Sequence, residues 1–292
     1  MENISHAQEN LNVLRRKVQV LYVLHTIIYA AALVLLLLNL YAAGMAVGVA
    51  NMLIYFVYLR RQLTAYSDAV ARVNVIYGLC SPLQNVEYTD KKGISEDKFN
   101  TFHMLPLRQG KGSSLSCRHA FSGRYGNMQF SGCEMTLHYP FKGQNNRVDY
   151  RFLNGTLLAA ENFSKQETAC GWLILCKNML EPSAEKQFLR ECGYHEAEVN
   201  KAELGEKLAV YTQEADGVLN ADMTNRLAKL AKSMQSLAAV RLMPDKAVIY
   251  LGNRFFTRRT KVRILPDEAA LCQNPLAERD DVFSFFRWWA EN

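Results

Sequence analysis

Residues 18–59 read VQVLYVLHTIIYAAALVLLLLNLYAAGMAVGVANMLIYFVYL and contain no Asp, Glu, Lys or Arg. A helix that crosses the roughly 30 Å hydrocarbon core of a bilayer needs about 17–25 apolar residues. Residues 18–40 and 42–59 each reach that length, and Asn39 and Gly44 interrupt the apolar run between their centres. Because lipid offers no partner for free backbone groups, both spans must be helical. The stretch therefore predicts a two-helix transmembrane hairpin with a tight turn at these two residues.

A signal peptide and a buried hairpin of a soluble protein are the alternatives to a membrane anchor. The apolar core of a signal peptide is only about 7–15 residues long and a cleavage site follows it, so the length of this stretch excludes one. Helices of soluble proteins normally keep a charged face, which is missing here. A membrane hairpin is therefore the better interpretation.

Basic residues lie just outside the two outer ends of the hairpin. Arg15, Arg16 and Lys17 precede it, Arg60-Arg61 follow it, and the turn carries no basic residue. Flanks that are rich in Lys and Arg remain on the cytoplasmic side. We therefore expect a multi-pass protein of the cell membrane with two spans, both termini being cytoplasmic.

Small and polar residues inside the hairpin indicate how its helices pack. Gly44 and Gly48 have the spacing that lets helices approach closely, either within the hairpin against Ala30–Ala32 or in a dimer. His25 and Asn51 are polar, and polar residues inside a span are candidates for function. Without an acidic residue they make a poor proton or ion path, so we expect a hydrogen bond between the helices.

Charge and cysteine content restrict the partners and cofactors of the rest of the chain. The 292 residues carry a net charge of +6, part of which comes from the hairpin flanks. The remainder is nearly balanced, so no nucleic-acid partner is expected. The 7 cysteines are an odd number without C-x-x-C spacing, which indicates free thiols in a reducing cytoplasm. Zinc-site spacing is also missing, and we expect neither a metal nor a cofactor.

The chain after the hairpin divides into a stalk and a domain. Residues 62–80 keep apolar residues at helical spacing up to Ser81-Pro82, which predicts a helical stalk that continues the second span. The predicted division is therefore 1–61 for the N-terminal segment and hairpin, 62–80 for the stalk, and 81–292 for a cytoplasmic domain.

Alternating apolar residues predict a mainly antiparallel sheet in the first half of this domain. After Gly132 the apolar phase shifts by one residue, which predicts a β-bulge there. Gly171–Cys176 is continuously apolar, as is typical of a central strand covered on both faces. His119 and His138 lie within alternating strands and have no acidic or thiol partner assignable by spacing. We therefore expect surface or half-buried histidines rather than catalytic ones.

The second half of the domain adds helices to the sheet. Asn220 is a candidate N-cap of a helix with one apolar face. Residues 237–243 and 247–251 flank a turn with Pro244 in its favoured second position, which predicts a β-hairpin. The predicted fold class is therefore α+β, with a few helices packed on a mainly antiparallel sheet.

Two C-terminal segments are candidates for membrane or partner contact. Residues 253–266 lack acids and hold five basic residues, Arg254, Arg258, Arg259, Lys261 and Arg263. Near anionic headgroups each contributes about 1 kcal/mol of attraction; the alternative is a solvated loop. The tail after residue 280 predicts a helix with one aromatic face: Val282, Phe285, Phe286 and Trp289. It either lies at the membrane interface or docks on the domain.

The chain as a whole resembles the bacterial two-span membrane proteins that are grouped by a domain of unknown function. The residues that carry the resemblance are Phe152–Phe163 (FLNGTLLAAENF), Val210–Thr212 with Ala215-Asp216, the helix Met223–Leu230, and Val248–Leu251. It departs from the family at Ala221-Asp222, where a proline often opens the helix. The resemblance implies a cytoplasmic domain on a membrane hairpin and association with a small membrane protein of the LemA type. It supplies no catalytic residues.

Three classes of function remain open. The sequence contains no G-x-S-x-G, H-E-x-x-H, Rossmann or Walker pattern, so no catalytic residue is assigned. This favours a membrane-anchored cytoplasmic binding or scaffold protein whose partners are the lipid bilayer and a membrane or cytoplasmic protein. The alternatives are a membrane-associated enzyme whose site is assembled from distant residues and an accessory subunit of a transport complex.

Overall fold

The computed structural model describes residues 4–79, 82–90, 93–107, 112–143, 147–162, 171–197, 204, 207–214, 219–256, 270–271 and 280–291. The chain divides into two compact units. The helical unit comprises Met1–Gly78 and Thr257–Asn274, and the sheet unit comprises Leu79–Phe256 and Pro275–Asn292.

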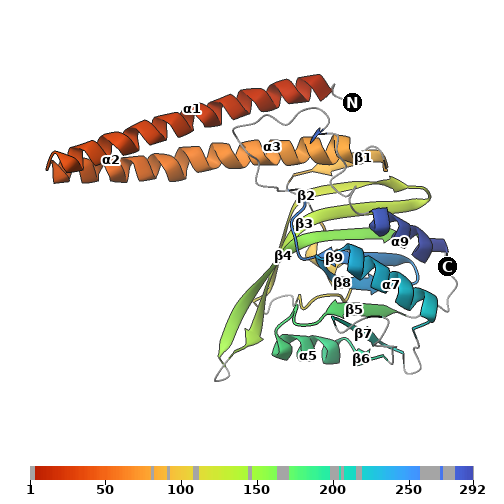
Figure 1. Cartoon of the computed structure of the whole chain (residues 1–292). Helices are drawn as coiled ribbons and strands as arrows, with labels where there is room; N and C mark the ends of the chain where they lie inside the picture. Colours follow the sequence, from red (N-terminus) through yellow and green to blue (C-terminus); the bar gives the residue numbers. More distant parts are fainter. Residues whose placement is uncertain are drawn as a thin grey trace. The chain divides into compact units, whose positions relative to one another are not determined.

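Two long antiparallel helices form the helical unit (Figure 1). The first is α1 (Ile4–Leu37), and the second consists of α2 (Tyr41–Ile54), the π-helical turn η1 (Tyr55–Leu59) and α3 (Arg60–Gly78). Both are long and apolar enough to cross a membrane, judged by length and composition. The second helix continues without a break beyond its apolar part, which confirms the predicted helical stalk.

The turn between the two helices is closed by a residue in the left-handed conformation. Asn39 has a φ of 61°, which asparagine adopts more readily than most side chains. Its N–H donates to the Leu36 carbonyl at 3.1 Å. The next N–H, that of Leu40, donates to the Leu35 carbonyl at 3.0 Å. These two bonds satisfy the last carbonyls of α1 in a Schellman motif, so the helix ends there and the chain reverses into α2.

One antiparallel sheet organises the sheet unit. Within the described residues it has nine strands in the order β1-β2-β3-β4-β9-β8-β5-β7-β6, and every neighbouring pair is antiparallel. The strands are β1 (Gln84–Thr89), β2 (Ser114–Tyr125), β3 (Met128–Lys142), β4 (Val148–Glu161), β5 (Trp172–Cys176), β6 (His195–Glu196), β7 (Leu208–Thr212), β8 (Leu237–Leu242) and β9 (Lys246–Leu251). With its packed helices, this sheet confirms the predicted α+β class. The apolar strand β5 is central, as predicted, because it lies between β8 and β7.

Two local predictions are confirmed, the helix N-cap at Asn220 and the hairpin around Pro244. Ser95 caps α4 (Glu96–Asn100) by accepting the Lys98 N–H at 3.2 Å. Asn220 caps α7 (Ala221–Ser233) by accepting the Met223 N–H at 2.8 Å. Strands β8 and β9 form the predicted hairpin. Each of these elements depends on contacts between residues that are close in sequence. A short sequence pattern can therefore predict it.

The helix α9 (Asp280–Glu291) packs on one face of the sheet, which we call the α9 face. The rings of Phe283 and Phe286 lie 5.0 and 5.5 Å from the ring of Phe130 on β3. The indole N–H of Trp289 donates to the Met243 carbonyl at 3.1 Å. All four residues that the sequence places on one side of this helix are buried, Val282, Phe285, Phe286 and Trp289. The tail therefore docks on the domain.

The opposite face of the sheet, which we call the α5 face, is covered by α5 (Pro182–Glu191), by α4 and by the segment that follows α4. Its core includes Phe99, Phe102, Met104, Cys133, Met135, Leu137, Tyr139, Leu157, Leu173, Leu175, Phe188, Tyr194, Val248 and Tyr250. Since successive side chains of a strand point to opposite faces, even-numbered residues of β3 and β4 belong to the α9 face and odd-numbered ones to the α5 face.

The predicted bulge at Gly132 is wrong. Strand β3 pairs with β4 without interruption from Gln129 to Lys142. The irregularity lies instead in β2, between Arg118 and Phe121. In β3 the apolar phase changes because the covered face changes. Helix α9 covers the beginning of the strand, and the α5-face core covers the rest.

Candidate binding surface

Strands β3 and β4 extend beyond most of the sheet as an arm (Figure 1). Strand β4 pairs with β9 only from Thr156 to Glu161, whereas its pairing with β3 continues to Val148. We define the arm as residues 138–142 of β3 and 148–152 of β4. Within the described sheet, the arm segment of β4 therefore pairs on one side only.

The α9 face of the arm carries exposed apolar side chains. Val148 and Phe152 are each 61% exposed, and Tyr150 is 53% exposed. The His138 ring stacks between the two aromatic rings, with its centroid 4.8 Å from that of Tyr150 and 4.6 Å from that of Phe152. The interplanar angles are 16° and 27°. We call these four residues the aromatic cluster; exposed apolar groups that lie together mark an interaction site more often than scattered ones do.

Positive charge lies at both ends of the aromatic cluster. The exposed Lys142 is directly opposite Val148 in the strand register. At the other end, the exposed Arg254 donates from Nη2 to Thr136 Oγ1 at 2.6 Å and to Asn154 Oδ1 at 2.8 Å. These two bonds hold its guanidinium on the α9 face, beside the cluster.

Acidic charge on this part of the α9 face is buried. Among the described residues of β2, β3 and β4, the acid on this face is Glu134, which is 4% exposed. Its Oε1 accepts the Phe256 N–H at 2.7 Å. The exposed part of the face therefore combines apolar and cationic groups, which suit a partner surface that is apolar with an acidic rim.

The structure describes only some of the other residues that were predicted to make contacts. Arg258, Arg259, Lys261 and Arg263 lie outside the described residues. In the hairpin, a Cβ at Gly44 would lie 2.8 Å from the Leu36 side chain and 3.1 Å from the Ala32 carbonyl. A Cβ at Gly48 would meet nothing within 4 Å. Gly44 thus lies at the contact between α1 and α2, and Gly48 points into open space.

The two polar residues of the hairpin contact each other. His25 Nδ1 lies 2.8 Å from Asn51 Oδ1. Asn51 Nδ2 also donates to the His25 carbonyl at 3.2 Å. This confirms the predicted hydrogen bond between the two helices. Because a polar group among apolar side chains is costly without a partner, the pair favours one alignment of the two helices.

The two strand histidines have different environments. His138 is half-buried, as predicted, and belongs to the aromatic cluster. His119 is 1% exposed, so the expected surface or half-buried position is wrong for it. Its backbone lies in the irregular part of β2 with a φ of 50°, and its Nδ1 lies 2.7 Å from the Tyr88 hydroxyl. The irregularity turns this ring inward, which strand alternation alone does not predict.

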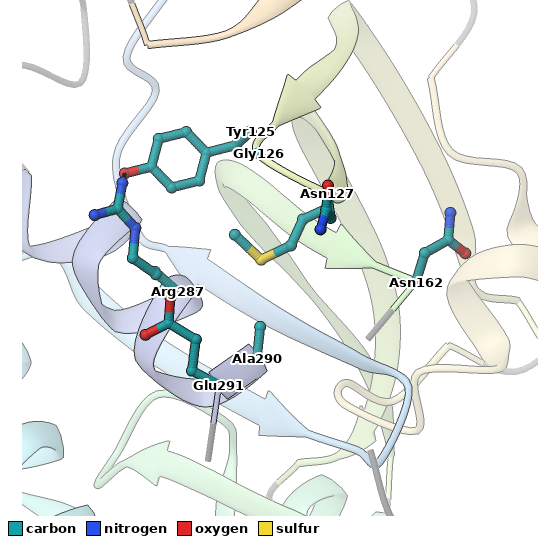
Figure 2. Close-up of a pocket in the computed structure, with 8 residues that line it drawn as sticks. Tyr125, Gly126, Asn127, Asn162, Arg287, Ala290 and Glu291 are labelled. Atoms are coloured by element: carbon teal, nitrogen blue, oxygen red, sulfur yellow. Dashed lines mark hydrogen bonds between the residues drawn. The ribbon is translucent and has the colours of Figure 1, made fainter. Parts of the chain in front are cut away.

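A pocket of about 400 Å³ lies beside the β2–β3 turn and α9 (Figure 2). Its lining consists of Tyr125, Gly126, Asn127, Met128, Asn162, Arg287, Ala290 and Glu291. Arg287 reaches over the Tyr125 ring and donates from Nη2 to its hydroxyl at 2.6 Å. The lining can hydrogen-bond a small polar molecule. The lining does not include His119 or His138.

A buried charge on β8 belongs to the core of the sheet unit. Arg241 is 4% exposed, and its Nε donates to the Phe102 carbonyl at 3.2 Å. Nη2 donates to Gln213 Oε1 at 3.1 Å, and the guanidinium lies 5.2 Å from the centroid of the Tyr194 ring. Burial lowers the pKa of Arg241 and raises the pKa of Tyr194. These contacts join three segments of the α5 face and indicate a structural role.

Other chemistry is limited in the part of the chain that the structure describes. It holds no group of three or more His, Cys, Asp or Glu side chains placed to bind a metal ion. Cys117, Cys133, Cys176 and Cys192 are free thiols, as predicted for them. The remaining cysteines, Cys80, Cys170 and Cys272, lie outside the described residues.

Comparison with known proteins adds one structural likeness. No protein-family model matches the sequence, and no curated protein matches it. Among solved structures, the chain is similar to the crystal structure of the mycobacterial trehalose monomycolate transport factor A, TtfA. The identity is 11% and the TM-score 0.36, and the match covers 76% of this chain and 93% of that chain.

Proposed function

We propose that this chain is a membrane-anchored binding protein. The helical hairpin holds the sheet unit at the cytoplasmic side of the cell membrane, and the aromatic cluster of the arm binds another protein. The observation that carries the proposal is the outward position of Val148, Tyr150 and Phe152, each more than half exposed on the α9 face.

The chemistry of the cluster supports protein binding. Aromatic side chains that are held in place before binding lose little conformational freedom in a complex, and they are the commonest anchors of interfaces. Full burial of one such side chain contributes about 1.5–3 kcal/mol. The stacked rings of His138, Tyr150 and Phe152 provide such anchors on adjacent strands. The expected partner surface is therefore apolar at its centre.

Cations at the rim favour acidic groups around that centre. Arg254 lies beside the cluster, and we propose that the basic run that follows it, Arg258, Arg259, Lys261 and Arg263, contacts the same acidic partner or anionic lipid. Rim charges change the rate of association more than the affinity. Arg254→Gln should therefore weaken binding less than loss of an aromatic anchor does.

The proposed membrane anchor is the helical hairpin. Both helices are long and apolar enough to span a bilayer, and basic residues flank their outer ends. A reporter fused after Asn292 should therefore be active in the cytoplasm of intact cells. Activity of that reporter on the outer side would overturn the proposed orientation.

Affinity capture with the full-length protein tests the binding function. The protein is extracted in mild detergent, and the proteins that it recovers from a lysate are quantified against Phe152→Ser and against Lys186→Ser, an exposed position on α5. We expect a defined partner that the wild type and Lys186→Ser recover equally and that Phe152→Ser recovers at least tenfold less. Equal recovery of every protein by all three forms would overturn the proposal.

A further inference from the structure

The free edge of β4 is complementary to itself. Residues 148–152 read Val-Asp-Tyr-Arg-Phe. Val148, Tyr150 and Phe152 lie on the α9 face, and Asp149 and Arg151 lie on the α5 face. In the described sheet this segment pairs with β3 and with no second strand. Its outer edge therefore presents backbone N–H and C=O groups to a further strand.

We propose that two copies of this chain pair along this edge, antiparallel, with Tyr150 opposite Tyr150 of the second copy. In that register Val148 lies opposite Phe152 of the second copy, so apolar side chains meet on the α9 face. On the α5 face Asp149 lies opposite Arg151 of the second copy, and the symmetric pair repeats this contact. Cross-strand pairs of both kinds stabilise a sheet.

Charge selects this register over its neighbours. A strand can slip only in steps that keep each side chain on its own face. A slip of one step places Asp149 opposite Asp149 of the second copy, and Arg147 opposite Arg151 of the second copy. A slip in the other direction places Arg151 opposite Arg151 of the second copy. Like charges directly opposite each other destabilise a sheet, so pairing centred on Tyr150 is preferred.

The charged side chains are accessible for this contact. Asp149 is exposed, and the Arg151 side chain is 39% exposed although its Nη1 pairs with Glu181 Oε1. A guanidinium has five N–H donors, so Arg151 can also bind Asp149 of the second copy. Pairing would place two aromatic clusters side by side on one continuous face. The inference does not require the proposed function, because the backbone groups of the strand edge and the Asp149–Arg151 pairs would join two copies whether or not the aromatic cluster binds another protein.

Disulfide trapping of the full-length protein in liposomes tests the register. Directly opposite residues have Cα atoms about 4.5–5.5 Å apart, within the range that a disulfide bridges. Tyr150→Cys should therefore form a covalent dimer on oxidation, beyond the amount given by the wild type with its native cysteines. Val148→Cys alone and Phe152→Cys alone should each form no covalent dimer. When the two variants are mixed in one liposome, the Val148→Cys chain should cross-link to the Phe152→Cys chain. Absence of a Tyr150→Cys dimer, or equal cross-linking by Val148→Cys alone, would overturn the proposal.

Charge variants provide an independent measurement. Asp149→Arg and Arg151→Asp each place like charges opposite each other, so each protein alone should be monomeric when its mass is measured by light scattering in detergent. Mixed together, they restore opposite charges and should form a heterodimer. The melting temperature of Arg151→Asp is measured as well, because that variant also loses its contact with Glu181. A dimer of Asp149→Arg alone, or a monomeric wild type at all concentrations, would contradict the inference.

Discussion

Gly44 and Gly48 are four residues apart on the same helix, but their surroundings in the hairpin differ. Both belong to one small-residue motif, and either could face the neighbouring helix. The structure distinguishes them, because a methyl group at Gly44 would contact Leu36 and Ala32, whereas one at Gly48 would meet nothing. Spacing identifies such a motif, but the rotation of each helix about its axis depends on packing along its whole length.

This difference predicts opposite effects of one substitution. Alanine is favoured over glycine in a helix by about 1 kcal/mol, so Gly48→Ala should leave the hairpin as stable or slightly more stable. Gly44→Ala gains the same helix preference but pushes α1 away from α2, so it should be less stable than Gly48→Ala by about 1 kcal/mol or more. The free energy of unfolding in mixed detergent micelles measures both. Equal values for the two variants would show that Gly44 is not at the helix contact.

The stability of the sheet unit should depend on pH through His103. Partial loss of solvent around the ring first, and then the charges of Arg241 and Lys246, lower the pKa of His103 below its ordinary value of 6.5. The folded protein therefore binds fewer protons at this site than the unfolded chain does. The free energy of unfolding should fall as the pH drops through 6.5 and stop falling below the pKa of the folded state.

His103→Asn separates this effect from other titrations. Asparagine tolerates the φ of 44° at this position and does not titrate. Between about pH 7 and about pH 5, a range centred near the ordinary histidine pKa, the melting temperature of the variant should decrease less than that of the wild type. Parallel decreases in the two proteins would exclude His103 as the source.

At the scale of elements, the tail helix α9 shows how burial decides a choice that the sequence leaves open. Its aromatic face suits a membrane interface as well as a protein core. The structure gives it the Phe130 ring and the Met243 carbonyl as partners. Those partners lie far from α9 in the sequence, so no local pattern could indicate them.

Phe286 should be the most sensitive position of this helix. Its side chain is fully buried against β3, and truncation of a buried phenylalanine costs about 3–5 kcal/mol. Phe286→Ala should therefore lower the melting temperature of the sheet unit by several degrees or more. Glu291→Ala, at an exposed position of the same helix, serves as the control and should change stability by no more than about 0.5 kcal/mol. A small effect of Phe286→Ala would indicate that α9 does not dock as described.

The strands show what the alternation of apolar and polar residues can and cannot predict. The period of two correctly predicts that β2, β3 and β4 are strands, and the caps and the β8–β9 hairpin follow from local chemistry. Alternation does not say which of the two faces is covered. For that reason the phase change in β3 resembled a bulge. For the same reason, the outward position of Val148, Tyr150 and Phe152 was not recognisable as a binding surface.

At the scale of the whole molecule, the chain returns to the helical unit after the sheet is complete. Leu271 is buried in a core with Leu11 and Tyr66, and Asn74 Nδ2 donates to the Leu271 carbonyl at 3.2 Å. No local pattern in the sequence indicates that Thr257–Asn274 belongs with the first helices. Only contacts between residues far apart in the chain reveal it.

Leu271 should therefore stabilise the helical unit despite its distance from it in the sequence. Leu271→Ala should lower the free energy of unfolding of that unit in mixed micelles by about 2–5 kcal/mol, the usual cost of truncating a buried leucine. The neighbouring Ala270 is exposed, so Ala270→Ser is the matched control and should have little effect. If both variants unfold like the wild type, the segment does not contribute to this core.

The division into units also means that the backbone passes from one unit to the other after Gly78, after Phe256 and after Asn274. A protease that cuts at one of these junctions leaves the other two peptide connections intact. Limited digestion of membrane vesicles should therefore nick the polypeptide long before it sheds a large fragment into solution. Under the proposed anchorage, a cut after Gly78 leaves the packing of Leu271 against Leu11 and Tyr66 as the remaining attachment of the sheet unit to the hairpin, so release also requires that packing to be lost.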